Sequence, residues 1–341
     1  MKNKLFLYAY CCDFEPYRGE GILANNFIGF LSKIYKNFNI VVVTPGNKFA
    51  YIKIKKNIYS KKKLNHSFFF KYFSPILGIV KIWIYHLGGH KTTYVNFLPL
   101  WNIFLFMLLP RKTILGPITG GHYQGKELNI KTMLRKIIIF KLYSISVFFI
   151  KIRKLKCIFS TKLLLGFLSN DIKNKSRFNF QFYNYSFQKK EKKKIDIIYY
   201  NRNYHTKDNK LVVNILKNLN KNYNIIIVGN YIEGFKNLGI VKRDKIINLL
   251  KKTRFVFSSP ENQLSYFVLD AISCDARIIS TSKLRPSFFN NYFIFPKKID
   301  YTNIKKILAI KNSKSLSLNY IAELKKNNLK LLNFMKSANG Y

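Results

Sequence analysis

Acidic residues are scarce in this sequence. Only 15 of its 341 residues are Asp or Glu, whereas 60 are Lys or Arg, so the formal net charge at pH 7 is +45. Lys, Asn and Ile together dominate the composition, a bias expected of an A·T-rich genome that can account for part of this charge. Whatever its origin, so basic a surface attracts polyanions, which makes anionic lipid and nucleic acid the first partners to consider.

Cysteine is also scarce. The four cysteines are Cys11, Cys12, Cys157 and Cys274, and they include no C-x-x-C pair and no metal-ligand spacing. This pattern favours buried thiols in a reducing cytoplasm over a disulfide framework.

Metal ligands are sparse as well. His86 and His90 lie four residues apart, yet the Gly-Gly between them is unsuited to a helix, and no carboxylate accompanies them. We therefore expect no metal site.

Long apolar runs are lacking too. A helix needs roughly 18 consecutive apolar residues to span a membrane. The nearest approach, Ile137–Ile150, is interrupted by Lys141. The run Leu5–Cys12 follows lysines as a signal peptide would, but it stops at Asp13 without a small-residue cleavage site. We expect no transmembrane helix, and we interpret Leu5–Cys12 as a first β-strand.

The apolar residues that are present suffice for two domains. Hydrophobic residues make up 48% of the chain, which argues against disorder, and the length suits two domains of about 150–180 residues. Asn170 to Gln181 is predicted to be a loop, and residues 186–194 form a lysine-rich linker. We therefore predict one domain over residues 1–182 and a second over residues 183–341.

The stretch Phe255–Ser280 is the most informative part of the chain. Its pattern predicts a strand, a polar loop, a short helix with one apolar face, a turn and a second strand. In an open parallel sheet, ligands bind outside the carboxyl ends of the strands, where helix N-termini offer free N–H groups to phosphate. The loop at that position carries Glu261, Asn262 and Gln263, and Asp270 lies on the helix. An ordinary βα unit with a polar loop remains the alternative.

Three other strand ends lead into loops that could bind ligands. Gly19 and Gly21 follow the first strand, where they permit close approach to an anion or simply form a tight turn. His122 ends a Gly-rich loop and either lines a cleft or is structural. Arg202 and Lys207 follow the first strand of the second domain. They either bind phosphate or are two surface cations of a lysine-rich protein.

Three further local expectations can be stated. Residues 48–72 interleave lysines with aromatic residues, which predicts an irregular segment. This segment is either a solvated face or a surface that meets a membrane or an anionic acceptor. Asp244 is expected to cap a helix over Asp244–Lys252, and Asn303–Lys336 is expected to be helical.

The second half of the chain, taken in order, resembles the C-terminal signature of the retaining glycosyltransferases of family 4, which have the two-domain GT-B fold. The ordered series is a strand, Arg202 and Lys207, a strand ending at Gly229, Leu238-Gly-Ile-Val241, a helix, Ser258-Ser259-Pro260, Asp270-Ala271 and Cys274-Asp275.

The sequence departs from the family pattern at three positions. Asn262 stands where the family has the first of two Glu residues, and Glu261 is one residue early. Asp270 replaces the second Glu, and Asp275 replaces a Gly.

The resemblance implies an α/β protein of the GT-B class, in which two Rossmann-like domains face each other across a cleft and the last helix packs back on the N-terminal domain. It implies metal-independent, hexosyltransferase-type transfer with retention, with a nucleoside diphosphate sugar as co-substrate and no other cofactor. The implied catalytic residues are Arg202 and Lys207 on the diphosphate, Glu261 beside the sugar, and His122 in the cleft. The implied donor-binding residues are Gly19, Gly21, Gly229, Ile240, Val241, Asn262, Gln263, Leu264, Ser265 and Asp270, the last of which would hold the ribose hydroxyls.

By the same resemblance, the acceptor is a glycan or a lipid-linked sugar, and the context is surface polysaccharide or lipopolysaccharide assembly. The protein is then expected in the cytoplasm, bound peripherally to the anionic inner face of the cytoplasmic membrane, with no specific nucleic-acid partner. Two alternatives remain. A catalytically inactive GT-B scaffold would explain Asn262, and a nucleic-acid-binding protein would explain the charge, although no such motif is present and the lysines are spread along the chain.

Overall fold

The chain divides into two compact units. A computed structural model describes residues 4–10, 19–35, 37–43, 49–53, 59–63, 68–95, 103–118, 130–160, 168–175, 177–178, 191–201, 210–258, 265–281, 290–310 and 317–337. Unit 1 comprises Met1–Phe182 together with Asn327–Tyr341, and unit 2 comprises Tyr183–Lys326. Helix α10 (Ser317–Ser337) therefore begins in the second unit and ends in the first.

Unit 1 is built on a sheet that, in the described residues, has eight strands in the order β4-β3-β2-β1-β5-β6-β7-β8. The strands are β1 (Lys4–Tyr10), β2 (Asn37–Val43), β3 (Phe49–Lys53), β4 (Tyr59–Lys63), β5 (Lys91–Val95), β6 (Ile114–Ile118), β7 (Lys156–Phe159) and β8 (Arg177–Phe178). All pairings are parallel except those of β3 with β2 and β4. The central strand β1 is buried on both faces from Leu5 to Ala9, which explains its unbroken apolar run.

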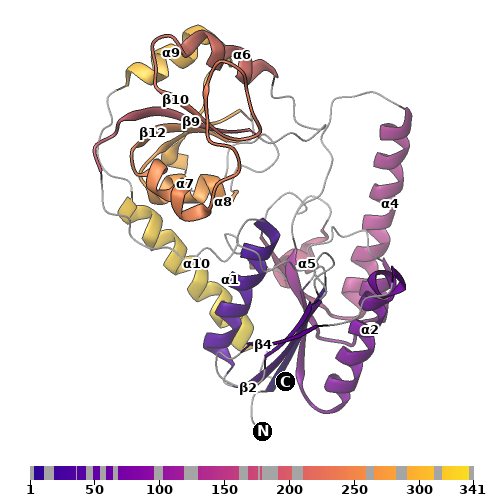
Figure 1. The fold of residues 1–341 in the computed structure, drawn as a ribbon. Helices are drawn as coiled ribbons and strands as arrows, with labels where there is room; N and C mark the ends of the chain where they lie inside the picture. Colours follow the sequence, from indigo (N-terminus) through magenta and orange to yellow (C-terminus); the bar gives the residue numbers. More distant parts are fainter. Residues whose placement is uncertain are drawn as a thin grey trace. The chain divides into compact units, whose positions relative to one another are not determined.

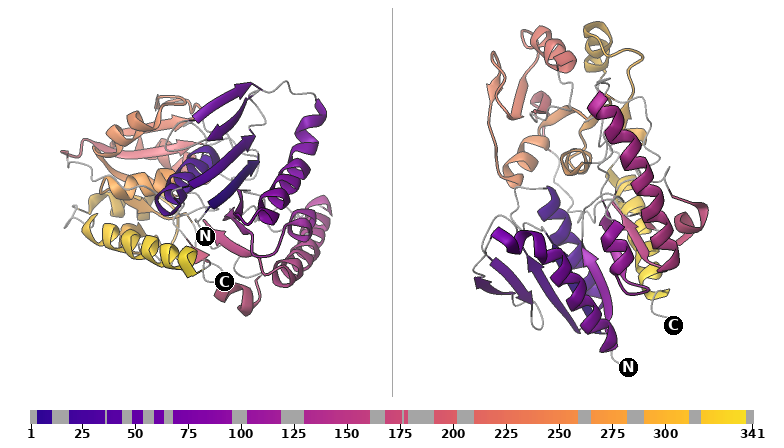
Figure 2. Two further views of the ribbon diagram at one scale, coloured as in Figure 1. Left: turned by 90° about the horizontal axis from the view of Figure 1, so that it is seen from below. Right: turned by 90° about the vertical axis from the view of Figure 1, so that its right-hand side faces the viewer.

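Helices cover both faces of this sheet. They are α1 (Gly19–Ile34), α2 (Phe68–Leu87), α3 (Ile103–Leu108), α4 (Ile130–Ile152) and α5 (Asn170–Lys175). Phe6 and Tyr8 point to the face that packs against buried residues of α2, α3, α4 and α5. Because side chains alternate along a strand, Leu5 and Leu7 point to the opposite face, where α1 lies (Figures 1 and 2).

Unit 2 is a doubly wound parallel sheet. Its described strands are β9 (Ile195–Asn201), β10 (Ile225–Gly229), β11 (Lys236–Asn237), β12 (Thr253–Phe257), β13 (Arg277–Ile279) and β14 (Phe293–Ile294). Their order, β11-β10-β9-β12-β13-β14, becomes 3-2-1-4-5-6 when the strands are counted within the unit, which is the strand order of dinucleotide-binding domains. The predicted α/β class with two Rossmann-like parallel sheets is confirmed.

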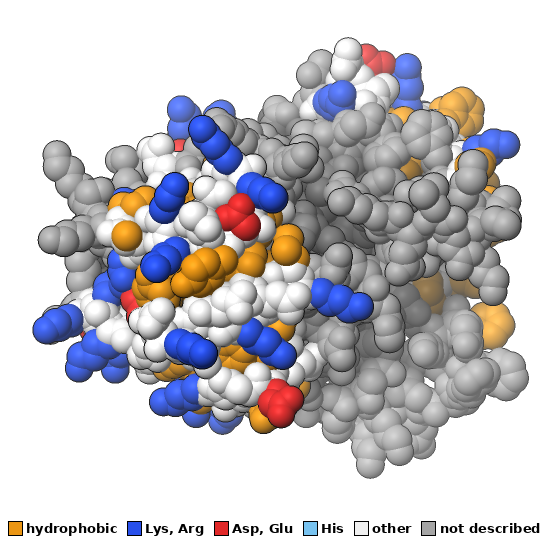
Figure 3. All heavy atoms as spheres, turned by 90° about the horizontal axis from the view of Figure 1, so that it is seen from above, with side chains coloured by type: hydrophobic (Ala, Val, Ile, Leu, Met, Phe, Trp, Pro, Cys, Tyr) orange, Lys and Arg blue, Asp and Glu red, His pale blue; other side chains and the backbone are white. Residues whose placement is uncertain are grey.

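In the described part of unit 2, two helices cover each face of the sheet. Helices α6 (Lys210–Leu219) and α9 (Tyr301–Ala309) pack on one face, where Ile197 and Phe255 belong to the shared core. Helices α7 (Arg243–Leu250) and α8 (Tyr266–Ser273) lie on the other face (Figure 1). Figure 3 shows Lys and Arg side chains spread over the described surface at the end of unit 2 that carries α6 and α9.

An ion pair joins the two central strands of unit 2 near their amino ends. Arg254 of β12 donates from Nη1 to Oδ1 of Asp196 in β9 at 2.9 Å. The same guanidinium donates from Nη2 to the backbone oxygen of Leu308 at 2.7 Å, where it satisfies a carbonyl in the last turn of α9. These bonds fix β9 beside β12 and leave the carboxyl ends of both strands at the opposite edge of the sheet.

The structure corrects four local expectations. Residues 48–72 are not irregular throughout, because β3 and β4 pair as antiparallel edge strands and α2 begins at Phe68. The predicted loop from Asn170 to Gln181 contains α5 and β8. The N-cap of α7 is Lys242, without a side-chain cap, and Asp244 lies in the first turn, where a carboxylate still complements the helix dipole. The helical stretch predicted over Asn303–Lys336 is divided into α9 and α10.

The helices of the described residues were also compared with the length and hydropathy that a membrane span requires. None of them combines enough length with enough apolar character to cross a bilayer.

Candidate functional site

Between β9 and β12 of unit 2, the direction in which successive strands are added to the sheet reverses. From β9 the chain continues to β10 on one side, whereas from β12 it continues to β13 on the other side. Ligands of doubly wound folds bind outside the carboxyl ends of the strands at such a switch point. The two strands that flank it end at Asn201 and Phe257.

Most of the predicted catalytic residues follow directly after these two strand ends. Arg202 and Lys207 belong to residues 202–209, and Glu261, Asn262, Gln263 and Leu264 belong to residues 259–264; both segments lie outside the described residues. His122, in unit 1, also lies outside them. In the sequence, the two segments therefore follow neighbouring strand ends.

The ends of β9 and β10 are bound tightly to each other. Asn230 donates its backbone N–H to the Asn201 oxygen at 2.9 Å, and Asn201 Nδ2 donates to the Asn230 oxygen at 3.1 Å. Gly229 has a φ of +96°, and a Cβ there would collide with the Asn201 backbone oxygen. Glycine is therefore required at 229 by both conformation and space.

The segment Leu238–Val241, which contains two of the implied donor-binding residues, crosses beside β10. Gly229 donates its backbone N–H to the Gly239 oxygen at 2.9 Å, which places the segment next to the strand end. Gly239 has a φ of +64°, so the chain turns there before Ile240 and Val241. Ile240 is 84% exposed, whereas Val241 is half-buried. An apolar side chain is thus presented to solvent at the carboxyl edge of the sheet.

A partly buried ion pair joins α7 to α8. Arg243 donates from Nε to one Asp270 oxygen at 3.0 Å and from Nη2 to the other at 2.7 Å. The Arg243 guanidinium also lies 5.6 Å from the ring centroid of Tyr266, within the range of a cation–π contact. Asp270 is only 2% exposed. The carboxylate that the sequence assigns to ribose binding is therefore held in place by a bidentate partner.

Helix α8 starts at the switch point. Ser265 is its N-cap and accepts from the Val268 N–H at 3.4 Å. All eight residues of α8 are buried, and Ser273 Oγ donates to the backbone oxygen of Asp270 at 2.7 Å. Packing therefore fixes the helix, and its N-terminus follows directly after the segment that contains Glu261 and Asn262.

Sequence comparison identifies no relatives. No protein-family model matches the sequence, and no curated protein matches it.

Solved structures are similar to the chain in fold. A glycosyltransferase from Rickettsia africae ESF-5 aligns over 99% of this chain and 97% of its own, with a TM-score of 0.52 and 12% identity. MnaA from S. aureus, in a co-structure with UDP, aligns over 90% and 87% with a TM-score of 0.48 and 10% identity. The β-glucosyltransferase of phage T4 aligns over 98% and 95% with a TM-score of 0.44 and 10% identity.

The fold assignment depends on the first similarity, which spans nearly the whole of both chains, and on the two parallel sheets. The chain has a GT-B fold. At identities this low, the similarity establishes the fold alone.

The predicted donor-binding residues of the GT-B fold fall in both units. Gly229, Ile240, Val241, Ser265 and Asp270 lie at or near the carboxyl edge of the unit 2 sheet or on the helices that pack against it. Gly19 and Gly21 belong to unit 1, where they form the first turn of α1 instead of the preceding loop, and Gly21 is buried.

Sequence reasoning missed Arg243 and Asn201. Arg243 is one of 60 basic residues, and 27 positions separate it from Asp270. No local pattern connects the two residues, because the packing of α7 on α8 brings them together. Asn201 gave a weak signal, since a polar residue at the end of an apolar strand is a candidate for fixing a turn.

The two described cysteines, Cys157 in unit 1 and Cys274 in unit 2, are poor nucleophiles. Burial raises the pKa of the Cys274 thiol to about 11 and that of the Cys157 thiol to about 12. Both thiols are therefore protonated at neutral pH, as expected for cysteines that serve packing. The predicted burial of the thiols is confirmed for these two residues. Within the described residues, no group of three or more His, Cys, Asp or Glu side chains is arranged to hold a metal ion.

Proposed function

We propose that this GT-B protein is a glycosyltransferase that moves a sugar from a nucleoside diphosphate sugar to a glycan or lipid-linked acceptor. The observation that carries this proposal is the strand order of unit 2. It brings the segment with Arg202 and Lys207 and the segment with Glu261 and Asn262 to the two strand ends that flank the switch point. The fold shared with a glycosyltransferase over almost the full length supports it.

The donor diphosphate would be bound by two cations. Arg202 can form paired hydrogen bonds to phosphate oxygens, and Lys207 can add a second positive charge. Together they would stabilise the negative charge that develops on the leaving nucleoside diphosphate, a task that other enzymes give to a metal ion. The N-terminus of α8, which follows β12 at the switch point, would add backbone N–H groups.

The ribose and the nucleobase would be bound by described residues. Arg243 uses one acceptor direction on each oxygen of Asp270. The ribose hydroxyls would be bound by the Asp270 carboxylate, which this pair holds in place. The Gly239–Val241 segment would contact the base through its backbone, with the exposed Ile240 as an apolar neighbour.

The transfer would proceed with retention of configuration, assisted by a group beside the transferred sugar. Glu261 can orient hydroxyls and stabilise positive charge that develops on the sugar, whereas Asn262 can only form hydrogen bonds. We assign the first role to Glu261 and a donor-sugar contact to Asn262. His122 would line the acceptor side. The transfer would be hexosyl transfer without a metal ion or a further cofactor.

The acceptor and the charge suggest where the reaction takes place. A lipid-linked acceptor would be reached from the cytoplasm, at the anionic inner face of the cytoplasmic membrane, during assembly of surface polysaccharide or lipopolysaccharide. A chain with a net charge of +45 would be attracted to that surface.

One observation favours a second candidate, an inactive GT-B scaffold that acts as a partner of an active enzyme. Asn262 stands at the register where the resembled family has its first Glu, and an amide cannot supply the negative charge. Such a scaffold would still bind a nucleotide sugar without turning it over.

Thermal unfolding of the full chain with a panel of nucleoside diphosphate sugars tests the proposal. A donor at about 100 times its dissociation constant should stabilise the fold by about 2.7 kcal/mol. The stabilising donor is then assayed for nucleotide release with and without a lipid-linked acceptor. Stabilisation without turnover would support the scaffold, whereas salt-sensitive RNA binding with no donor response would support the nucleic-acid alternative.

A further inference from the structure

The outer surface of α2 is apolar from Phe73 to Leu87. Phe73, Ile76, Val80, Ile84 and Leu87 follow one another at intervals of three or four residues, so they form a single stripe along the helix. Each of these side chains is between 49% and 79% exposed. Contiguous exposed apolar surface of this kind marks a binding surface.

The inner surface of α2 is apolar as well, which fixes the orientation of the helix. Ile79 and Ile82 are buried in the core beside Tyr8 and Tyr94. A Cβ at Gly78 would collide with the Tyr8 ring, so α2 lies directly against the sheet. The outer stripe therefore cannot turn inward. A helix that is apolar on both sides is expected where both sides are buried away from water.

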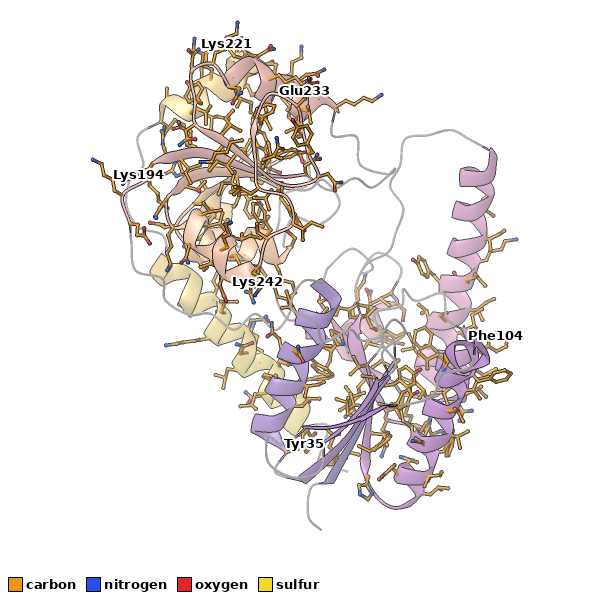
Figure 4. All side chains as sticks on the ribbon, viewed as in Figure 1. Tyr35, Phe104, Lys194, Lys221, Glu233 and Lys242 are labelled. Carbon is orange, nitrogen blue, oxygen red and sulfur yellow. The ribbon has the colours of Figure 1, made fainter. Side chains whose placement is uncertain are left out.

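Helices α3 and α4 extend this surface. Helix α3 packs against both α2 and α4, and Trp83 Nε1 donates to the Leu108 oxygen at 2.7 Å. Phe104 of α3 is 73% exposed and points away from the sheet (Figure 4). On α4, Ile138 and Phe148 are 55% and 58% exposed. We call the exposed side chains of Phe73–Leu87, Ile103–Leu108 and Ile137–Ile152 the α2–α3–α4 face.

This face is also basic. The three helices contain no Asp or Glu, and Lys81 and Lys141 are exposed among the apolar side chains. Residues 21–170 contain 24 Lys and Arg and a single acid, Glu127. Lys151 pairs with Asp171 at 3.0 Å, but both side chains are more than half exposed, so this pair neutralises little of the surrounding charge.

We propose that the α2–α3–α4 face docks on an anionic lipid bilayer, with its apolar side chains at the boundary of headgroups and acyl chains. Exposed apolar stripes with interspersed lysines are the features of helices that lie in that boundary. Each lysine near an anionic surface strengthens binding about fivefold. A second copy of the chain fits less well, because it would bring two strongly basic surfaces together. The proposal rests on the proposed function for the lipid-linked acceptor, but the docking can be measured without sugar transfer.

Flotation of the full chain with phosphatidylcholine vesicles, with and without phosphatidylglycerol, tests the docking. The chain should float with the anionic vesicles and be released by salt. Val80→Gln/Ile84→Gln should weaken this partition by at least about tenfold, because both side chains would otherwise enter the bilayer. Lys81→Gln/Lys141→Gln should weaken it about tenfold or more on anionic vesicles.

A matched control is Leu211→Gln/Leu329→Gln. These residues are 51% and 58% exposed, against 49% and 62% for Val80 and Ile84, but they lie on α6 and α10. The control should float as the wild type does, and all variants should keep the melting temperature of the wild type.

Three results would overturn the docking: no flotation of the wild type, equal loss in the α2 variant and the control, or a stable dimer that Val80→Gln/Ile84→Gln dissociates without any change in flotation. Donor-induced stabilisation is measured on the same samples. If it persists without flotation, only the docking is wrong; if flotation persists without it, only the proposed function is wrong.

Discussion

Arg243 and Asp270 form a bidentate ion pair, 3.0 Å from Nε and 2.7 Å from Nη2 to the two carboxylate oxygens. The pair joins the first residue of α7 to the middle of α8. Because Asp270 is almost completely buried, the guanidinium offsets the cost of removing the carboxylate from water. The same bond holds the side chain that we assign to the donor ribose.

Removal of Arg243 should destabilise unit 2. Arg243→Ala leaves a buried carboxylate without its partner, which we expect to lower the free energy of unfolding by about 3 kcal/mol. Urea denaturation gives this value directly. Arg243→Met/Asp270→Leu removes both charges and should recover most of the loss. Lys245→Ala, an exposed position on the same helix, should stay within about 0.5 kcal/mol of the wild type, and an equal loss there would contradict the assignment.

Substitution of Gly229 should be more damaging than substitution of Gly234. Both residues have positive φ, +96° and +84°. A Cβ at 229 would collide with the Asn201 oxygen, whereas a Cβ at 234 would meet nothing within 4 Å. Gly234→Ala should therefore cost about 1 kcal/mol for the backbone conformation alone. Gly229→Ala should cost about 1–3 kcal/mol more, because the strand end must also move. Similar melting temperatures for the two variants would show that the collision is relieved without cost.

The diphosphate assignment predicts a large kinetic effect of two cations. Arg202→Ala or Lys207→Ala should each raise the barrier by about 2–4 kcal/mol, measured as the loss in kcat/KM with the donor found by the thermal panel. Lys210→Ala is the matched control, since Lys210 is an exposed lysine at the start of α6. Near-normal turnover in both the Arg202 and the Lys207 variant would contradict the assignment of these residues to the donor diphosphate.

The neighbouring positions Glu261 and Asn262 can be separated by comparison of two variants. If Glu261 supplies the charge beside the sugar, Glu261→Gln should lower kcat strongly, because an amide cannot stabilise developing positive charge. Asn262→Ala should mainly raise KM through the loss of a donor-sugar contact. The opposite result, with kcat intact in Glu261→Gln and abolished in Asn262→Ala, would assign the role to Asn262. Normal kcat in both variants would show that neither Glu261 nor Asn262 contributes to catalysis.

Several features of the protein were determined by its sequence. The alternation of apolar strands and amphipathic helices in the second half predicts a parallel sheet, because each type of element buries its apolar residues with its own period. The central stretch Phe255–Ser280 was placed correctly as strand, helix and strand. The strands before the predicted polar loops could be located for the same local reason, since Pro and polar residues interrupt an apolar run.

Only the tertiary structure decided the relationships between distant residues. The pairing of Arg243 with Asp270 depends on the packing of α7 against α8, which no local pattern encodes. The pairing of β3 with β4 likewise required a neighbouring strand edge, because lysine-rich sequence by itself does not favour a strand. Helix α2 carries apolar residues on two opposite sides, so its sequence could not show which of them packs against Tyr8 and which stays exposed. The position of the sheet settled that question, since only one side of a helix can face it.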